Sequence, residues 1–392
     1  MKFGDFSSEH CLSTPTGRTA LKVIRRTVAA IVIGLMFLVA ITVVDHQLQT
    51  VLPSPTGSYP IGRTTLRLIN SHDSPDPARE VFAWIWYPAA DGEAGSQASY
   101  LPLQWRTAME DRDGLPGKIL SRDMARIGTH SIDSAAVRAS TPPWPIVLFR
   151  GGLSALGPEY TVLAEDWASR GFVVVAIDAP GRSLVYVEAD GHVVQRSAEN
   201  DADAAETIET LREMLPRLAN QWVADASTVL DRLSEMSADS SSSWFGRLDT
   251  ARVAMVGHSL GGATALQFCR ADQRCKAAID IDGLVTPDVA REGVRRPTLM
   301  LMGEHPAREL QDPVNRQIEQ DIASAVQHSA SGSLTRVSMT EANHFNFSDG
   351  AVTKNHALMG ALRLFHVVNM SPELQLTSTA ELCRDFLSRQ LQ

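Results

Sequence analysis

The stretch best suited to chemistry is RVAMVGHSLGGATALQF, Arg252 to Phe268, which contains a serine in a Gly-x-Ser-x-Gly pattern. An apolar, strand-like segment precedes the serine, and small and apolar residues typical of a helix follow it. A tight turn between strand and helix forces its central residue into strained geometry, and flanking glycines let the two elements approach. The sequence therefore predicts Ser259 as a nucleophile held at a helix N-terminus.

A serine hydroxyl is a weak nucleophile unless a base takes its proton. Among the 11 histidines, His344 lies in EANHFNFSD, directly after the last expected strand, LTRVSM. The order serine, acid, histidine along the chain is that of the α/β-hydrolase arrangement. His258 adjoins the serine, but alternation at a sharp turn is expected to point its side chain away from the site. We therefore predict His344 as the base.

The acid that orients the histidine has two main candidates. Asp282 closes KAAIDID, the strand-like segment after the nucleophile's helix, and Glu304 closes the next segment, PTLMLMG. The carboxyl ends of parallel strands meet at one edge of a sheet, where the serine also lies. Asp280 points to the same side as Asp282 but lies deeper in its strand. The residues by themselves leave Asp282 and Glu304 as equal alternatives.

An acyl-transfer site also needs an oxyanion hole, which is a pair of backbone N–H groups aimed at the developing negative charge. Leu260, the residue after the nucleophile, would supply one of them. The second is expected from the loop RGGLSALG, where Gly151 and Gly152 allow the backbone to come close. An ordinary glycine turn is the alternative explanation of this loop.

Short apolar segments that alternate with helical ones would position these residues. Such alternation predicts an α/β fold with a mostly parallel sheet and helices on both faces. The expected strands are TTLRLI, VFAWIWYP, PIVLF, FVVVAID, RVAMVG, KAAIDID, PTLMLMG and LTRVSM.

Two regions fall outside this regular pattern. The stretch from about Asp91 to Pro143 is polar and irregular, with an expected helix at Lys118 to Ile127. In the long helical region before the nucleophile, Pro216 is expected to start or kink a helix. Six apolar residues at helical spacing in that region are expected to contact the core: Leu218, Trp222, Ala226, Val229, Leu230 and Leu233.

The N-terminal segment has the composition of a membrane helix. Lys22, Arg25 and Arg26 precede an uncharged, apolar run from Thr27 to Val44. The run is long enough to cross a bilayer, and basic residues in front of it keep that end in the cytoplasm. Because the run lacks a small-x-small cleavage site at its end, an uncleaved anchor is favoured over a signal peptide.

We therefore expect a cytoplasmic tail (1–26), a transmembrane signal-anchor (27–44), a linker (45–60) and an α/β-hydrolase domain (61–392). The domain would lie on the periplasmic or extracellular side of a membrane. Secretion after signal cleavage is the first alternative. A buried core helix is the second, and the adjacent pair Arg25 and Arg26 argues against it.

Composition narrows the classes of partner. The 392 residues are 44% hydrophobic and 21% charged, which is typical of a globular protein. The formal net charge of −9 leaves no basic footprint, so no nucleic-acid partner is expected. No cysteine and histidine cluster has metal-site spacing, and the predicted chemistry needs neither a metal nor another cofactor. The sequence gives no oligomeric state.

The four cysteines would divide between two compartments. Cys11 would face the reducing side, and Cys269, Cys275 and Cys383 would lie in an oxidising one. Cys269 and Cys275 are close enough in sequence to bridge across a helix end, and free buried thiols are the alternative.

Several segments resemble the plasma-type platelet-activating factor acetylhydrolase family and its bacterial relatives. The similar segments lie between roughly Tyr59 and Phe365 and are YPIGRTTLRLI, EVFAWIWYPA, WASRGFVVVAIDAPGRS, GHSLGGATALQFCRADQRCKAAIDIDG and HFNFSD. The resemblance implies Asp282 as the acid, with Glu304 in reserve, and His344 as the first residue of an H-x-N-F-x-D segment. It also implies Leu153 as the second oxyanion donor. Arg150 departs from relatives that have histidine at this position, which leaves the backbone donor intact.

The resemblance further implies a serine-dependent ester hydrolase that works through an acyl-enzyme. Its substrates would be short-chain or oxidised acyl esters of phospholipids, with soluble esters or lactones as the alternative. An acyltransferase would share the same residues, whereas a non-catalytic binding domain would normally lack one of them. A dienelactone hydrolase would have a cysteine at the nucleophile. Candidates for an acyl pocket, with core packing as the alternative, are Phe345, Phe347, Trp105 and Trp144.

Overall fold

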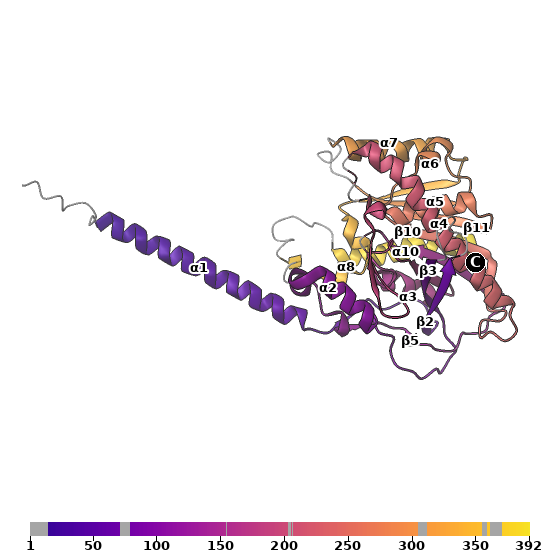
Figure 1. The fold of residues 1–392 in the computed structure, drawn as a ribbon, viewed down its shortest axis with the longest axis horizontal. Coiled ribbons are helices and arrows are strands. Elements are labelled where there is room, and N and C mark those ends of the chain that lie inside the picture. Colours follow the sequence, from indigo (N-terminus) through magenta and orange to yellow (C-terminus); the bar gives the residue numbers. More distant parts are fainter. Residues whose placement is uncertain are drawn as a thin grey trace, which may run out of the picture.

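In the computed structural model, the described part of the chain folds around a nine-stranded sheet (Figure 1). The structure describes residues 15–70, 79–153, 155–202, 205, 207–304, 312–354, 359–360 and 371–392. The strand order is β13-β12-β11-β10-β6-β7-β3-β2-β5. The strands are β2 (Ile61–Asn70), β3 (Arg79–Pro88), β5 (Ile132–Asp133), β6 (Trp144–Arg150), β7 (Val173–Asp178), β10 (Leu248–His258), β11 (Cys275–Ile281), β12 (Thr298–Gly303) and β13 (Leu334–Met339).

The sheet is mostly parallel, which confirms the predicted fold class. All neighbours from β13 to β7 pair in parallel, and β3 pairs antiparallel with both β7 and β2. All eight segments expected to be strands lie in strands of this sheet. Their apolar runs are readable from sequence because a parallel sheet is buried on both faces.

Helices cover both faces because alternate side chains of each strand point to opposite sides. On one face, α3 (Thr161–Ser169) and α10 (Pro372–Leu391) share an apolar cluster with β6, β7, β10, β11 and β12. On the other, α4 (Ile208–Ala238) and α5 (Leu260–Ala271) pack against the alternate residues of β6, β7 and β10. A third apolar cluster contains residues of α6 (Pro287–Glu292), α7 (Pro313–His328) and β12.

The predicted apolar stripe of α4 is confirmed, since all six of its residues are buried. The expectation that Pro216 starts a helix is wrong, because α4 begins earlier, at Ile208, and contains Pro216. The expected helix at Lys118 to Ile127 is also misplaced. The chain instead forms α2 (Leu103–Leu120), with non-helical backbone at Gly114, and a separate 3₁₀ turn at Met124–Arg126. Glycine permits that break, which apolar periodicity does not reveal.

The remaining elements are short. The two-stranded sheets pair β1 (Thr50–Val51) with β4 (Ile127–Gly128) and β8 (Val185–Val187) with β9 (Val193–Gln195). Further 3₁₀ segments lie at Gly157–Tyr160, Ala198–Asn200 and His344–Phe347, the last of which is labelled η6. The short helix α8 (Gly350–Thr353) follows η6.

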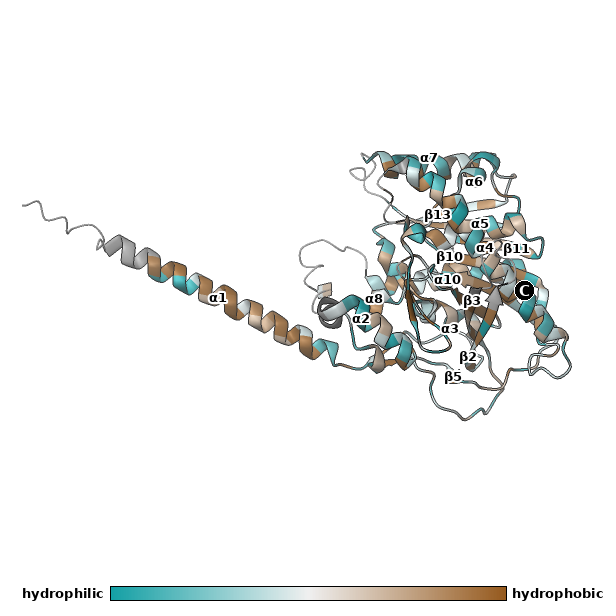
Figure 2. Ribbon diagram, in the orientation of Figure 1, coloured by the Kyte–Doolittle hydropathy of each residue, from teal (hydrophilic) through white to brown (hydrophobic). Residues whose placement is uncertain are grey.

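The N-terminal helix, α1 (Pro15–His46), projects away from the sheet (Figure 1). Within it, Leu21–His46 is long and apolar enough to cross a membrane, with a mean hydropathy of 2.8 over an 18-residue window, and a signal sequence would have the same properties. Figure 2 shows that its residues are mostly hydrophobic and that the helix lies outside the folded unit. Most of its apolar side chains are exposed. The chain therefore has one N-terminal apolar helix in its described part, suited to be a signal peptide or an anchor.

The end of α1 is built into the folded unit. Asp45 is buried and forms an ion pair with Arg122, with 2.9 Å between Oδ1 and Nη2. The His46 Nδ1 atom donates a hydrogen bond to the Ser121 carbonyl oxygen at 2.7 Å. The backbone N–H of Asp123 donates in turn to the His46 carbonyl. Further along the expected linker, the Thr56 hydroxyl donates to Asp166, so residues 45–60 follow the surface of the domain closely.

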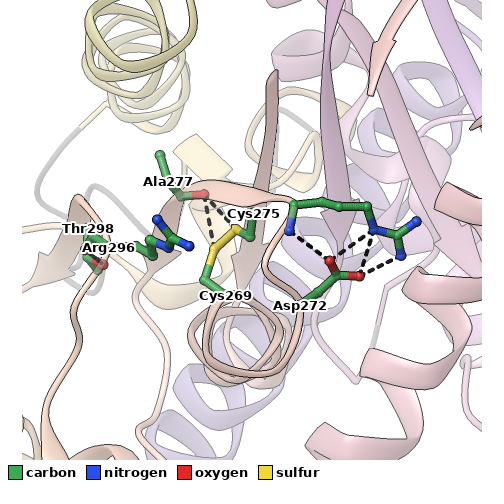
Figure 3. Close-up of a disulfide and its surroundings, with 7 residues drawn as sticks. Cys269, Asp272, Cys275, Ala277, Arg296 and Thr298 are labelled. Atoms are coloured by element: carbon green, nitrogen blue, oxygen red, sulfur yellow. Dashed lines mark hydrogen bonds and ion pairs between the residues drawn. A yellow bond between two sulfur atoms is a disulfide. The ribbon is translucent and has the colours of Figure 1, made fainter. Parts of the chain in front are cut away.

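A disulfide joins Cys269, near the end of α5, to Cys275, the first residue of β11 (Figure 3). Both sulfur atoms lie 3.3 Å from the Ala277 carbonyl oxygen. The sequence allowed either this bridge or two free buried thiols, and the structure has the bridge. Cys383 is a buried free thiol in α10, and Cys11 lies outside the described residues.

Candidate active site

Ser259 lies at the turn between β10 and α5. Its backbone has φ 58° and ψ −122°, in the left-handed half of the map that non-glycine residues rarely adopt. Its N–H donates to the Ile281 carbonyl at 2.9 Å, which ties the turn to the end of the neighbouring strand β11. Such strain is held only where surrounding contacts enforce it, and it is concentrated at functional sites.

Both glycines of the pattern are required by close backbone contacts. A Cβ atom on Gly257 would lie 1.9 Å from the Gly261 carbonyl oxygen, and one on Gly261 would lie 2.1 Å from the Arg150 carbonyl oxygen. No side chain fits at such distances. The turn therefore packs directly on the end of β6, as the sequence pattern predicts.

His344 and Asp282 face each other at the same edge of the sheet. The His344 Nδ1 atom lies 2.7 Å from Asp282 Oδ2, and the backbone N–H of Gly303 donates to Asp282 Oδ1 at 2.7 Å. Burial would raise the pKa of Asp282, but the hydrogen bonds from His344 and Gly303 outweigh it and hold this pKa below its ordinary value. The carboxylate is therefore ionised and can orient the imidazole.

The two other acids considered lie elsewhere. Glu304 is exposed at the end of β12, and its side chain has no hydrogen bond or ion pair within the described residues. Asp280 is fully buried, and burial raises its pKa well above the ordinary value. Its Oδ1 atom lies against the backbone of Gly262 and Gly283, under the start of α5. Neither carboxyl is bonded to His344.

The two expected oxyanion donors flank Ser259. Leu260 is the first residue of α5, so its N–H has no acceptor within the helix. The N–H of Leu153 has no acceptor among the described residues either, whereas its carbonyl accepts from Arg196 Nη1 at 2.6 Å. A Cβ atom on Gly152 would lie 3.2 Å from the Ser259 Cβ, which places this loop directly beside the serine.

His258 has a different position from the one expected. Its buried ring lines the cavity and lies 4.6 Å from the His344 ring, between centroids, so the expectation that it points away from the site is wrong. His258 is still part of β10 and continues the alternation of Ala254 and Val256, which puts its ring on the face of the sheet that carries Tyr160 and Phe347, and the cavity opens on this face. The Tyr160 hydroxyl donates to His258 Nδ1 at 2.8 Å and accepts from the Gly152 N–H at 3.1 Å.

A cavity of about 400 Å³ opens beside Ser259 and His344. Residues from four parts of the chain line it: Gly152, Leu153, Ala155, Glu159, Tyr160, His258, Ser259, His344, Phe345, Ser348, Gly350 and Lys354. Of the four aromatic residues proposed for an acyl pocket, Phe345 alone is in this lining. Phe347, Trp105 and Trp144 are buried in the core.

Arg150 does not reach the cavity lining. Its guanidinium lies 4.0 Å from the centroid of the Trp222 ring and donates to the Ile177 carbonyl. Its departure from the histidine of relatives is therefore accommodated in the core beneath the loop, and the backbone of Gly151 to Leu153 is unaffected.

The loop that carries His344 is fixed by two side chains that sequence reasoning did not assign. Asp349 accepts from the N–H groups of Thr161 and Val162, at 2.8 and 3.1 Å, and so binds the start of α3. Gln375 exchanges two hydrogen bonds with the backbone of Asn343. Asp349 is the last residue of the H-x-N-F-x-D segment, but nothing in the sequence indicates its partners.

Across the described residues, no group of three or more His, Cys, Asp or Glu could hold a metal.

A comparison with protein families places the chain. The family model described as platelet-activating factor acetylhydrolase, isoform II, matches residues 44–392. The chain belongs to this family. The match agrees with the resemblance seen in the sequence and extends it to the C-terminal helix.

Individual relatives are distant. The platelet-activating factor acetylhydrolase of Canis lupus familiaris is 24% identical over 259 residues, and that of Bos taurus is 25% identical over 264 residues. In both cases the match covers 61% of this chain and 56% of the relative, so the chain spans little more than half the length of these curated relatives. A probable 1-alkyl-2-acetylglycerophosphocholine esterase of Arthroderma benhamiae is 25% identical over 150 residues, 38% of this chain and 34% of that one.

Among solved structures, a ferulic acid esterase from Streptomyces cinnamoneus is similar, with a TM-score of 0.67 and 23% identity. The superposition covers 88% of this chain and 94% of the esterase. At this level of identity the similarity establishes an esterase-like α/β fold.

Proposed function

We propose that the protein is a serine esterase in which Ser259, His344 and Asp282 form a catalytic triad. The observation that carries the proposal is the 2.7 Å hydrogen bond between the buried Asp282 and His344, which lines the same cavity as the strained Ser259. In this arrangement, the nucleophile, base and orienting acid have the roles that acyl transfer requires. Membership of the family supports the same reaction class.

The reaction would proceed in two balanced steps. Ser259 Oγ attacks the ester carbonyl carbon while its proton moves to His344 Nε2, and the N–H groups of Leu153 and Leu260 stabilise the oxyanion. The imidazolium, stabilised by Asp282, then protonates the leaving alcohol as the ester bond breaks. In the second step a water molecule gives its proton to His344 and attacks the acyl-enzyme, and the acid leaves as the proton returns to Ser259.

The substrates we propose are short-chain or oxidised acyl esters of phospholipids. The names of the curated relatives support this class, since they refer to platelet-activating factor and 1-alkyl-2-acetylglycerophosphocholine. The cavity supports it as well, because Phe345 and Leu153 provide apolar surface beside Ser259 while Lys354 provides a positive charge. A short acyl chain and a charged headgroup could each contact matching groups.

We also propose that α1 is a signal-anchor, with residues 1–26 in the cytoplasm, 27–44 across the membrane, 45–60 leading outward and 61–392 as the catalytic domain. The basic residues before the apolar run support this orientation. An anchored esterase would lie next to its lipid substrates.

Labelling with a fluorophosphonate tests the mechanism, because this probe reacts with activated serines. The full chain is labelled in detergent micelles and digested, and mass spectrometry locates the adduct. We expect it on Ser259, with turnover of p-nitrophenyl acetate and of 2-acetyl glycerophosphocholine in vesicles. The absence of an adduct, or an adduct on another residue, would reject the triad. Turnover of soluble esters alone would keep the mechanism and reject the lipid substrate.

Ser259→Ala is the matched control for this experiment. We expect the variant to lose at least about 10⁴-fold in kcat/KM, as when the nucleophile of a triad is removed. Its Tm should stay close to that of the wild type, since only a single half-buried hydroxyl is lost. Adding an alcohol acceptor distinguishes a transferase, which would form a new ester in preference to the free acid.

A further inference from the structure

The contacts of Tyr160 and His258 form a connected chain beside Ser259. The Tyr160 hydroxyl accepts from the Gly152 N–H at 3.1 Å and donates to His258 Nδ1 at 2.8 Å. Tyr160 is 1% exposed and His258 5% exposed, so water does not compete for these bonds. For the Tyr160 hydroxyl to donate in this bond, His258 has to be neutral with its proton on Nε2, and burial, together with the neighbouring His344, lowers the pKa of His258 to about 3.

The protein is shaped to accommodate this tyrosine. A Cβ atom on Gly151 would lie 2.7 Å from the Tyr160 ring, and the Phe149 ring packs against the other side with 4.7 Å between centroids. Gly151 and Gly152 therefore leave room for the ring as well as for close approach to Ser259. The loop they form leads directly into Leu153.

From this geometry we propose that Tyr160 and His258 are positioning residues of the oxyanion hole. His258 fixes the direction of the Tyr160 hydroxyl, and the hydroxyl fixes the Gly152 N–H and with it the loop that presents the Leu153 N–H. The His258 ring also stacks on His344, at 4.6 Å and an interplanar angle of 37°, and restricts its rotation. This inference rests on the proposed function, because it assumes that the Leu153 N–H binds an oxyanion.

Tyr160→Phe tests the proposal by deleting only the hydroxyl. The oxyanion forms after the ground state, so kcat for p-nitrophenyl acetate should fall by about 10- to 100-fold while KM stays within about twofold. The rate of fluorophosphonate labelling should fall in parallel, with Ser259 still labelled at the end point. Tyr87→Phe is the matched control, because it removes another buried tyrosine hydroxyl, bonded to the Ala135 carbonyl at 2.7 Å. We expect a similar fall in Tm for this variant and a wild-type kcat.

Two substitutions of His258 provide an independent test. The side-chain amide of asparagine is smaller than an imidazole but carries an oxygen acceptor close to the Nδ1 position. His258→Asn therefore keeps a partner for the Tyr160 hydroxyl, whereas His258→Leu removes it. We expect kcat to fall about as far in His258→Leu as in Tyr160→Phe and to recover by several-fold in His258→Asn. This pair decides the matter even where Tyr160→Phe does not fold.

The outcomes separate the two proposals. A wild-type kcat in Tyr160→Phe, or equal losses in His258→Asn and His258→Leu, would overturn the positioning role and leave the triad intact. A parallel fall of kcat in Tyr87→Phe would show a general loss of stability and would also overturn the positioning role. A wild-type chain without turnover or label on Ser259 would overturn both.

Discussion

Asp282 is subject to two opposing effects at the scale of a single residue. Burial favours its neutral form, whereas His344 and the Gly303 N–H favour its ionised form, and the second effect is the stronger. Its backbone also has a positive φ of 48°, as Ser259 has one of 58°. Two strained residues at adjacent strand ends indicate that the packing of the sheet edge fixes the site.

Asp282→Asn should reduce kcat by about 10⁴-fold, because an amide orients the wrong tautomer of the histidine. Glu304→Gln is the matched control at the end of the next strand and should leave kcat unchanged, because its exposed side chain has no bond to His344. Steady-state kinetics on p-nitrophenyl acetate measures both. A large loss in Glu304→Gln together with an active Asp282→Asn would exchange the two assignments.

Asp349 links stability to pH. Burial raises its pKa from 3.8 to about 8, against the opposing effect of the N–H groups of Val162 and Thr161. Between these two values the folded chain holds one proton more than the unfolded chain does, so this group's contribution to the free energy of unfolding falls as pH rises. It is fully present below the lower value and lost above the higher one.

Asp349→Asn removes this titration. The difference in unfolding free energy between wild type and variant should change in favour of the variant by up to about 1.4 kcal/mol per pH unit as pH rises through this window. Urea denaturation at several pH values between the two pKa values measures it. Buried carboxyls elsewhere in the domain, such as Asp280, titrate in both proteins and cancel in the difference. A constant difference across the window would contradict the assignment.

At the scale of elements, the buried ion pair of Asp45 and Arg122 joins α1 to the segment after α2. Removing one partner leaves a buried charge uncompensated, so Arg122→Ala should lower the unfolding free energy by about 3–5 kcal/mol. The exposed pair of Arg112 and Asp113 is the control, and Arg112→Ala should change the unfolding free energy by less than about 1 kcal/mol. Chemical denaturation of the full chain in micelles measures both, and equal effects would show that burial does not matter here.

The strands could be predicted from sequence because their apolar residues either form runs or alternate with polar ones, whereas α2 could not. Its break at Gly114 depends on how the chain packs, and Pro216 is tolerated inside α4 because the rest of that helix buries a continuous apolar stripe. In the site, Ser259 could be predicted because the tight turn between strand and helix requires glycine on both sides of it, and this requirement appears in the sequence as the Gly-x-Ser-x-Gly pattern. The alternation of β10 fixes the face on which His258 lies, but that the cavity opens on this face, beside Tyr160, depends on contacts far away in sequence. The contacts of Asp349 with α3 are equally distant and leave no local pattern.

At the scale of the whole molecule, the α1 helix and the catalytic domain make opposite demands on their surroundings. Most apolar side chains of α1 are exposed, while those of the sheet are buried. Exposed apolar surface of this length is stable in a bilayer and unstable in water. The chain therefore has one part suited to lipid and one suited to water.

Different tags at the two termini distinguish an anchor from a cleaved signal peptide. We expect both tags in one full-length band that stays in the membrane pellet after alkaline carbonate extraction. Protease added outside sealed cells or spheroplasts should remove the C-terminal tag and spare the N-terminal one, because in the proposed orientation the basic residues keep that end in the cytoplasm. A shortened, extractable chain that has lost the N-terminal tag would instead indicate cleavage.

The tight junction at Asp45 and His46 has a mechanical consequence. No slack segment separates α1 from the domain, since buried contacts begin where the helix ends. A membrane helix tilts to match the thickness of its bilayer. If α1 spans a membrane, this junction would make the domain rotate together with the helix when the helix tilts. The thickness of the bilayer would then set the angle between the lipid surface and the cavity beside Ser259.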